Sequence, residues 1–127
     1  MGPRKRILVV DVDELVLIQL ERILEDAGFD TTVTWDLQHA MSLLAADIFD
    51  LVLVGDHPPE INAKELLTSM RAWRYSPLCL VIQPSAMMAA AEYLQLGASD
   101  VVCRHQYDDV LRRVNAHLRQ AALAAAA

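Results

Sequence analysis

Acidic and histidine side chains stand directly after short apolar runs at three places in the chain. Asp11 and Asp13 follow the first run, Asp56 and His57 follow a second, and His105 follows a third. Residues i and i+2 project the same way at the end of a strand, so Asp11 and Asp13 are able to share a magnesium ion. Together with the two imidazoles, the three carboxylates are also the types of ligand that bind a transition metal. The alternative is that the histidines and Asp56 are polar loop residues facing solvent.

Short apolar runs alternate with longer amphipathic stretches along the chain. The pattern predicts strands at 7–10, 31–35, 51–54, 78–82 and 101–103. It predicts helices at about 16–27, 36–46, 62–71, 86–96 and 110–118, the last running into an alanine tail. Gly28 and Gly97 are expected to end two helices, and Asp36 and Asn62 to cap the start of two others. Strands that alternate with helices predict a three-layer α/β/α sandwich around a five-stranded parallel sheet.

The residues that follow the strands meet at the carboxyl edge of such a sheet, where ligands bind near the topological switch point. The segments concerned are 11–14, 55–57, 83–85 and 104–106. The fold class therefore predicts one edge at which the acidic and histidine side chains gather.

The composition narrows the class of protein. The 127 residues, 54% hydrophobic and 22% charged, suit a single domain spanning residues 1–127. Eleven Lys and Arg against seventeen Asp and Glu give a net charge of −6, which argues against direct binding to nucleic acid. Cys79 and Cys103 lie within apolar runs, which excludes a disulfide scaffold. The sequence contains neither a signal-peptide core nor an apolar run long enough for a membrane span, so a cytoplasmic protein is expected.

Six short motifs, in this order and spacing, resemble the receiver domain of bacterial response regulators, typified by the chemotaxis regulator. They are Ile-Leu-Val-Val-Asp at 7–11, Ala-Gly-Phe at 27–29, Asp-Leu-Val-Leu-Val at 50–54, Pro59 with Glu65-Leu66-Leu67 beyond it, Ser-Pro-Leu at 76–78 and Gly-Ala-Ser-Asp at 97–100. The resemblance covers essentially the whole chain and implies the flavodoxin-like (β/α)5 receiver fold. It also implies two-component (phosphorelay) signal transduction, in which a histidine kinase supplies a phosphoryl group to an aspartate at the end of the third strand. Mg²⁺ held by neighbouring carboxylates assists that transfer.

Compared position by position, the chain departs from the receiver pattern at the phosphorylation pocket. Asp11 stands at the first acidic position, but Val12 stands where receivers have their main metal carboxylate. Counting back from Pro59, the phosphoacceptor position falls on Gly55, which has no side chain to phosphorylate.

The positions that bind the phosphoryl group in receivers also carry different residues here. The hydroxyl position falls on Ile82 and the lysine position on Arg104, while His105 replaces the usual proline. We therefore expect an atypical pseudo-receiver that is not an enzyme, requires no cofactor and works through protein–protein contacts.

A displaced phosphoacceptor is the nearest alternative. If the end of the third strand were bulged by one residue, Asp56 would point into the pocket beside Asp11 and Asp13, bind Mg²⁺ with them and accept the phosphoryl group. The alternation of side chains along a strand favours the opposite, because a shift of one residue turns a carboxylate to the other face.

A second alternative is an enzyme. The run Asp11-Val12-Asp13-Glu14-Leu15 resembles the first motif of haloacid dehalogenase-like phosphatases, which depend on magnesium, with Asp11 as the nucleophile and Asp13 as the acid/base. Glu14 and Leu15 depart from that motif, and no paired aspartates follow a later apolar strand.

Apolar residues also lie on helix faces that do not belong to the core stripe. Ile18 lies opposite the core stripe of the first helix with Leu15 on its flank, and the fourth predicted helix carries Met87, Met88 and Tyr93. In receivers the first helix docks the histidine kinase or phosphotransfer protein, and the fourth helix, fifth strand and fifth helix form an output or homodimer face. These five residues are therefore candidates for contacts with such a partner, another signalling protein or a second copy. The alternative is a few apolar residues scattered on well-packed helices.

Overall fold

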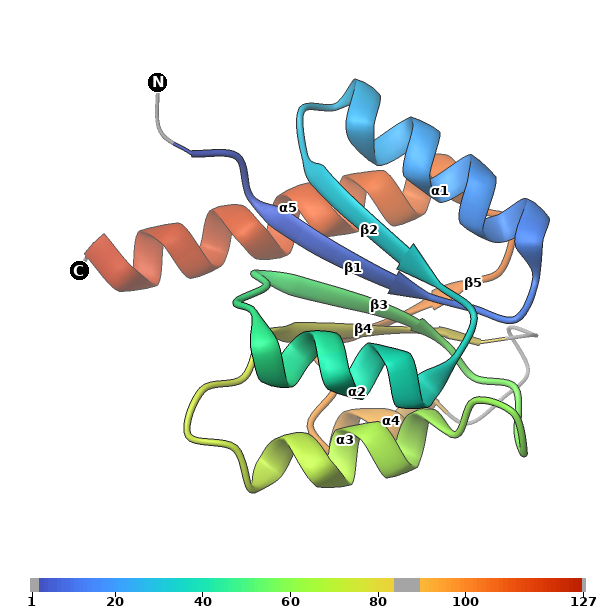
Figure 1. The fold of residues 1–127 in the computed structure, drawn as a ribbon. Coiled ribbons are helices and arrows are strands. Elements are labelled where there is room, and N and C mark those ends of the chain that lie inside the picture. Colours follow the sequence, from blue (N-terminus) through green and yellow to red (C-terminus); the bar gives the residue numbers. More distant parts are fainter. Residues whose placement is uncertain (1–2, 84–89, 127) are drawn as a thin grey trace.

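The chain forms a doubly wound α/β sandwich, shown by a computed structural model that describes residues 3–83 and 90–126 (Figure 1). Five parallel strands form one sheet in the order β2-β1-β3-β4-β5. The strands are β1 (Arg6–Val10), β2 (Asp30–Thr34), β3 (Leu51–Gly55), β4 (Leu78–Gln83) and β5 (Asp100–Cys103). The helices in the described part of the chain are α1 (Glu14–Asp26), α2 (Leu37–Ala46), α3 (Ala63–Arg71), α4 (Ala90–Gln95) and α5 (Tyr107–Ala126). This strand order is the flavodoxin-like order that the sequence predicted.

The two faces of the sheet carry separate apolar cores. Helices α1 and α5 cover one face, and α2, α3 and α4 cover the other (Figure 1). Successive residues of a strand point to opposite faces, so Val9 and Leu53 pack under α1 and α5 while Val10 and Val54 pack under the other three helices. Burial on both faces explains why the central strands are continuous apolar runs rather than alternating ones.

Side-chain caps begin three of the helices. Asp36 Oδ1 accepts a hydrogen bond from the Gln38 N–H at 3.0 Å, and Asn62 Oδ1 accepts one from the Glu65 N–H at 3.2 Å. Both caps confirm the sequence prediction. Asp13, which the sequence predicted as a metal-binding or acid/base carboxylate, is the N-cap of α1.

Glycines end two helices in the left-handed conformation. Gly28 follows α1 with φ of 96°, and Gly97 follows α4 with φ of 109°. A residue with a Cβ is strained in this region, which is why glycine is the usual residue just after a helix.

Two details differ from the predicted elements. Strand β2 ends at Thr34, so Trp35 leaves the sheet and its side chain is 73% exposed. Helix α4 is described from Ala90, and the predicted interface residues Met87 and Met88 lie outside the described residues. No helix in the described ranges has the length and apolar character needed to cross a membrane.

Candidate functional site

The ends of three strands bring the predicted pocket residues together at the carboxyl edge of the sheet. Asp11 follows β1, Gly55 ends β3 and Arg104 follows β5. The parallel ladder pairs Gly55 with Ile82 of β4, which places the predicted phosphoacceptor and hydroxyl positions at the same level of the sheet. The predicted positions therefore occupy one site, although their side chains are unusual for it.

Asp11 and Arg104 form a forked ion pair at the centre of this site. Arg104 Nη1 donates to both carboxylate oxygens of Asp11 at 3.1 Å, and Nη2 donates to Oδ1 at 3.1 Å. The backbone N–H of Asp13 donates to the same Oδ1 at 2.8 Å. Burial raises the pKa of the fully buried Asp11, and the Asp13 N–H and the Arg104 charge oppose that rise. A planar guanidinium makes this double contact, whereas the single ammonium of a lysine does not.

Gly55 is next to this ion pair, and the Asp11 carboxylate fills the space that a side chain at position 55 would need. A Cβ placed on Gly55 would lie 2.0 Å from Asp11 Oδ2 and 2.7 Å from its Cγ. Both distances are far below van der Waals contact. In this arrangement position 55 accepts only a glycine, and the carboxylate of Asp11 lies where an acceptor side chain would begin.

Asp56 lies on the other side of the sheet from Asp11. Its Oδ1 accepts a hydrogen bond from the Ala63 N–H at 3.0 Å, and its Oδ2 accepts one from the Tyr93 hydroxyl. Asp56 is buried against α3 and α4 rather than exposed in a loop, so the expectation of a solvent-facing carboxylate was wrong. Burial and the bond to Asp56 raise the pKa of Tyr93. The bulge required for a displaced acceptor is absent at this position, because β3 continues regularly through Gly55.

The Asp13 carboxylate caps the N-terminus of α1. Its Oδ1 accepts a hydrogen bond from the Leu15 N–H at 2.9 Å. Among residues 3–83 and 90–126, no three His, Cys, Asp or Glu side chains gather closely enough to hold a metal ion. The set of Asp11, Asp13 and Asp56 therefore does not form one acidic cluster in the described structure.

Comparison with known proteins identifies the family to which this fold belongs. The family described as "Response regulator receiver domain" matches residues 7–115. The chain belongs to the response regulator receiver family. The transcriptional regulatory protein CpxR of Escherichia coli (strain K12) is 29% identical over 116 residues, covering 91% of this chain and 50% of CpxR. The chain thus spans about half the length of such curated relatives.

Solved receiver structures share the fold. A CheY-like receiver domain protein from Methanospirillum hungatei JF-1 matches with a TM-score of 0.83 and 22% identity, covering 93% of this chain and 96% of that one. An orphan response regulator of H. pylori matches with a TM-score of 0.79 and 24% identity, covering 91% of this chain and 99% of that one. Receiver domains belong to two-component signalling and interact with histidine kinases or phosphotransfer proteins.

The residues of this receiver domain do not fit the Mg²⁺ ion that the family uses. A divalent ion of this kind needs several oxygen ligands in one place. The described pocket offers the carboxylate of Asp11, whose two oxygens already accept hydrogen bonds from Arg104, while Val12 and Gly55 supply no side-chain oxygen. The guanidinium supplies the positive charge next to Asp11.

The switch positions of this receiver domain are also altered. Ile82 is buried in the apolar core under α1 and α5 and offers no hydroxyl. His105, at the usual proline position, has φ of 70°. A proline ring holds φ near −65°, so the backbone after β5 takes a path here that the usual proline does not permit.

The two histidines of the predicted transition-metal site make separate contacts. His57 is largely exposed, and its Nε2 lies 3.8 Å from Glu60. His105 contacts Tyr107, with Nδ1 3.4 Å from the hydroxyl and the rings edge to face. Neither arrangement gathers further ligands among the described residues.

The geometry of Asp11 and Asp13 also argues against the phosphatase alternative. A nucleophilic Asp11 needs a free carboxylate oxygen facing a substrate, but both oxygens accept hydrogen bonds from Arg104 and the residue is fully buried. The proposed acid/base residue, Asp13, holds the first turn of α1.

The predicted interface residues differ in how exposed their side chains are. Leu15 is 69% and Ile18 48% exposed on α1, as predicted for surface residues. Tyr93, in contrast, is buried against Asp56, so its expected exposure was wrong. A helix of small alanines surrounding one tyrosine gives no sequence signal of which side faces the sheet.

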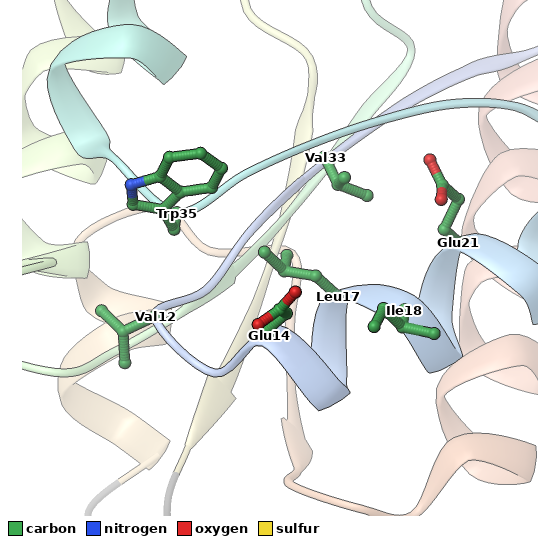
Figure 2. Close-up of a pocket in the computed structure, with 7 residues that line it drawn as sticks. All are labelled: Val12, Glu14, Leu17, Ile18, Glu21, Val33 and Trp35. Carbon is green, nitrogen blue, oxygen red and sulfur yellow. The ribbon is translucent and has the colours of Figure 1, made fainter.

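Sequence reasoning assigned Trp35 to a partly exposed strand and did not include it among the candidate contact residues. It lies with Ile18 beside a pocket between α1 and β2 (Figure 2). The sequence carried no signal that separates Trp35 from the strand, because an N-cap at Asp36 permits the strand to end at residue 34 or at residue 35.

Proposed function

We propose that this receiver domain, spanning residues 1–127, signals as an atypical pseudo-receiver in the cytoplasm, through protein–protein contacts and without an aspartyl phosphate. The proposal requires no cofactor, no enzymatic activity and no direct contact with nucleic acid. Its expected partner is a histidine kinase, a phosphotransfer protein or another signalling protein. A second copy, bound through α4, β5 and α5, is a further candidate.

One observation carries the proposal. The acceptor position is Gly55, and the space for a side chain there is taken by the Asp11 carboxylate, whose Oδ2 would lie 2.0 Å from a Cβ. The pocket has no acceptor oxygen at that position and no space for one. The ion pair between Asp11 and Arg104 also supplies internally the opposite charges that Mg²⁺ and a phosphoryl group would otherwise bring.

Regulation without phosphorylation requires a partner that prefers one conformation of the domain. A ligand shifts a conformational equilibrium only by the difference between its affinities for the two states. Partner binding therefore takes the place of the covalent signal.

A phosphodonor experiment tests this proposal. The chain is incubated with a small phosphodonor and magnesium, and its intact mass is measured, with a phosphorylatable receiver treated in parallel as a control. We expect an unchanged mass for this chain and a phosphoryl adduct on the control.

An acid-labile adduct on this chain would overturn the proposal. If the adduct disappears in Asp56→Ala, the displaced aspartate is the acceptor. If instead the chain releases phosphate steadily from a phosphomonoester and Asp11→Asn abolishes the release, the chain is a phosphatase.

A further inference from the structure

An open pocket of about 440 Å³ lies between α1 and the end of β2, and neither Asp11 nor Arg104 lines it (Figure 2). Its apolar lining comes from α1, from β2 and from the loops beside them, namely Val12, Leu17, Ile18, Val33 and Trp35. A pocket of this size is large enough to accept one or two large side chains. We call it the α1–β2 groove.

Two of these side chains are costly to leave in water. Trp35 is 73% and Ile18 48% exposed, and they stand on opposite sides of the groove (Figure 2). Exposed tryptophan at the rim of an apolar hollow is typical of protein interfaces, where aromatic residues dominate the binding energy. Both side chains would be covered by a segment lying in the groove.

The polar lining of the groove has one sign of charge. Glu14 and Glu21 line it, and no Lys, Arg or His does so among the described residues. They are seven residues apart on α1, which places their Cα atoms about 10 Å apart along the helix axis. Two negative charges at this spacing flank the apolar floor.

We propose that the α1–β2 groove binds a segment of a partner protein that carries a large apolar side chain between two basic residues. The basic residues would stand about 10 Å apart to meet Glu14 and Glu21. This spacing corresponds to positions i and i+7 of a helix or i and i+3 of an extended segment. This inference rests on the proposed function, because it assumes that the chain signals through protein contacts. It adds the chemical character of one partner segment.

The charge of the chain favours a different protein over a second copy. The chain carries a net charge of −6, and a copy would bring that same excess of negative charge to an acidic groove. Like charges facing each other across an interface oppose association, whereas complementary ones select the partner.

Selection from a library of random peptides displayed on phage tests the inference without knowledge of the natural partner. Peptides are selected on the wild-type chain and counter-selected against the double variant Ile18→Ser/Trp35→Ser. The enriched sequences should share a large apolar residue flanked by Lys or Arg at one of the two spacings. A synthetic peptide of the enriched sequence should bind Glu14→Gln/Glu21→Gln about tenfold more weakly, because two ion pairs at the groove are lost.

Matched variants separate the groove from general effects. Glu65→Gln/Asp108→Asn removes two exposed carboxylates from α3 and α5, and Ile48→Ser removes an exposed isoleucine that does not line the groove. Neither should change the affinity by more than about twofold. Circular dichroism checks that every variant is folded.

Three outcomes would overturn the inference. They are the absence of enrichment, an enriched motif without basic residues, and peptide binding that Glu14→Gln/Glu21→Gln leaves unchanged. A wild-type dimer that Ile18→Ser dissociates would identify a second copy as the occupant instead. None of these outcomes bears on the phosphodonor experiment, where an adduct would overturn the proposed function alone.

Discussion

At the scale of single residues, Gly55 and Asp11 depend on each other. The Asp11 carboxylate occupies the space beside the Gly55 Cα, and Gly55 lies outside the left-handed region, so alanine suits its backbone and only the contact with Asp11 opposes it. The pair therefore gives a direct test of the pocket geometry.

Gly55→Ala is expected to destabilise the wild-type chain by about 2 kcal/mol, because the new methyl group collides with a carboxylate that the ion pair holds in place. In an Asp11→Ala background the same substitution should cost less than about 0.5 kcal/mol, since the obstacle is gone. Urea unfolding of the four chains measures both costs. Equal costs in the two backgrounds would show that Asp11 does not fill this space.

The same collision bears on attempts to restore phosphorylation. Gly55→Asp alone should give an unstable chain with no phosphoryl adduct, because the new side chain meets Asp11 before it reaches the pocket. The result is read by intact mass after treatment with a phosphodonor and magnesium. An adduct on this single variant would mean that Asp11 moves aside readily.

At the scale of elements, α4 is held to α3 and to the end of β3 by polar contacts. The Tyr93 hydroxyl donates to Asp56, Lys64 pairs with Glu92, and Arg71 Nη2 donates to the Gln95 carbonyl at 2.5 Å. The first contact is buried and the other two are exposed. The buried one is therefore the larger contribution to the position of α4.

Tyr93→Phe is expected to cost about 2 kcal/mol, because it leaves the buried Asp56 carboxylate without one of the two donors that the described residues supply. Hydrogen exchange should rise first in α4. Tyr75→Phe is the matched control, since the Tyr75 side chain is largely exposed and its hydroxyl makes a long 3.4 Å contact with the Phe49 carbonyl. A loss of stability no greater than that of the control would remove Asp56 and Tyr93 from this role.

The sequence predicted the elements well where the information was local. Five apolar runs became five strands, Asp36 and Asn62 capped helices, and Gly28 and Gly97 ended them. The alternation rule also gave the correct face for Asp56 relative to Asp11.

The side-chain partners in the site could not be predicted in this way. That Asp11 turns toward position 55, and that Asp56 meets Tyr93, depends on residues from different strands and helices packing together. The sequence placed Arg104 and Asp11 in the same pocket, but it did not predict the forked contact between them. Exposure of Asp56 was the natural expectation for a loop carboxylate and failed because α4 covers it.

At the scale of the whole molecule, β5 and α5 are joined by a charged network. Asp100 accepts a hydrogen bond from Arg113 at 2.9 Å, and its other oxygen lies 2.9 Å from His117 Nε2. Burial alone would raise the pKa of Asp100, but His117, the Val101 N–H and Arg113 together lower it below its usual value.

This lowered pKa predicts how stability changes with pH. The unfolded chain binds a proton at Asp100 more readily than the folded one, so the contribution of Asp100 is complete above its usual pKa near 4 and is lost as the pH falls through the lower, folded value. Asp100→Asn should cost about 2 kcal/mol at pH 7 and progressively less below pH 4. Urea unfolding across this range measures the difference, with Asp108→Asn as the control. A cost that does not change with pH would exclude the charge of Asp100 as its source.

The ion pair between Asp11 and Arg104 joins positions 93 residues apart, at the ends of the first and the last strand. A nascent or truncated chain that stops before Arg104 leaves Asp11 buried without its counter-charge, which is a heavy penalty for a partly assembled sheet. The ion pair therefore stabilises the sheet only when all five strands are in place. It makes the folding of the five-stranded unit more nearly all-or-none, so that half-finished sheets with exposed edges remain rare.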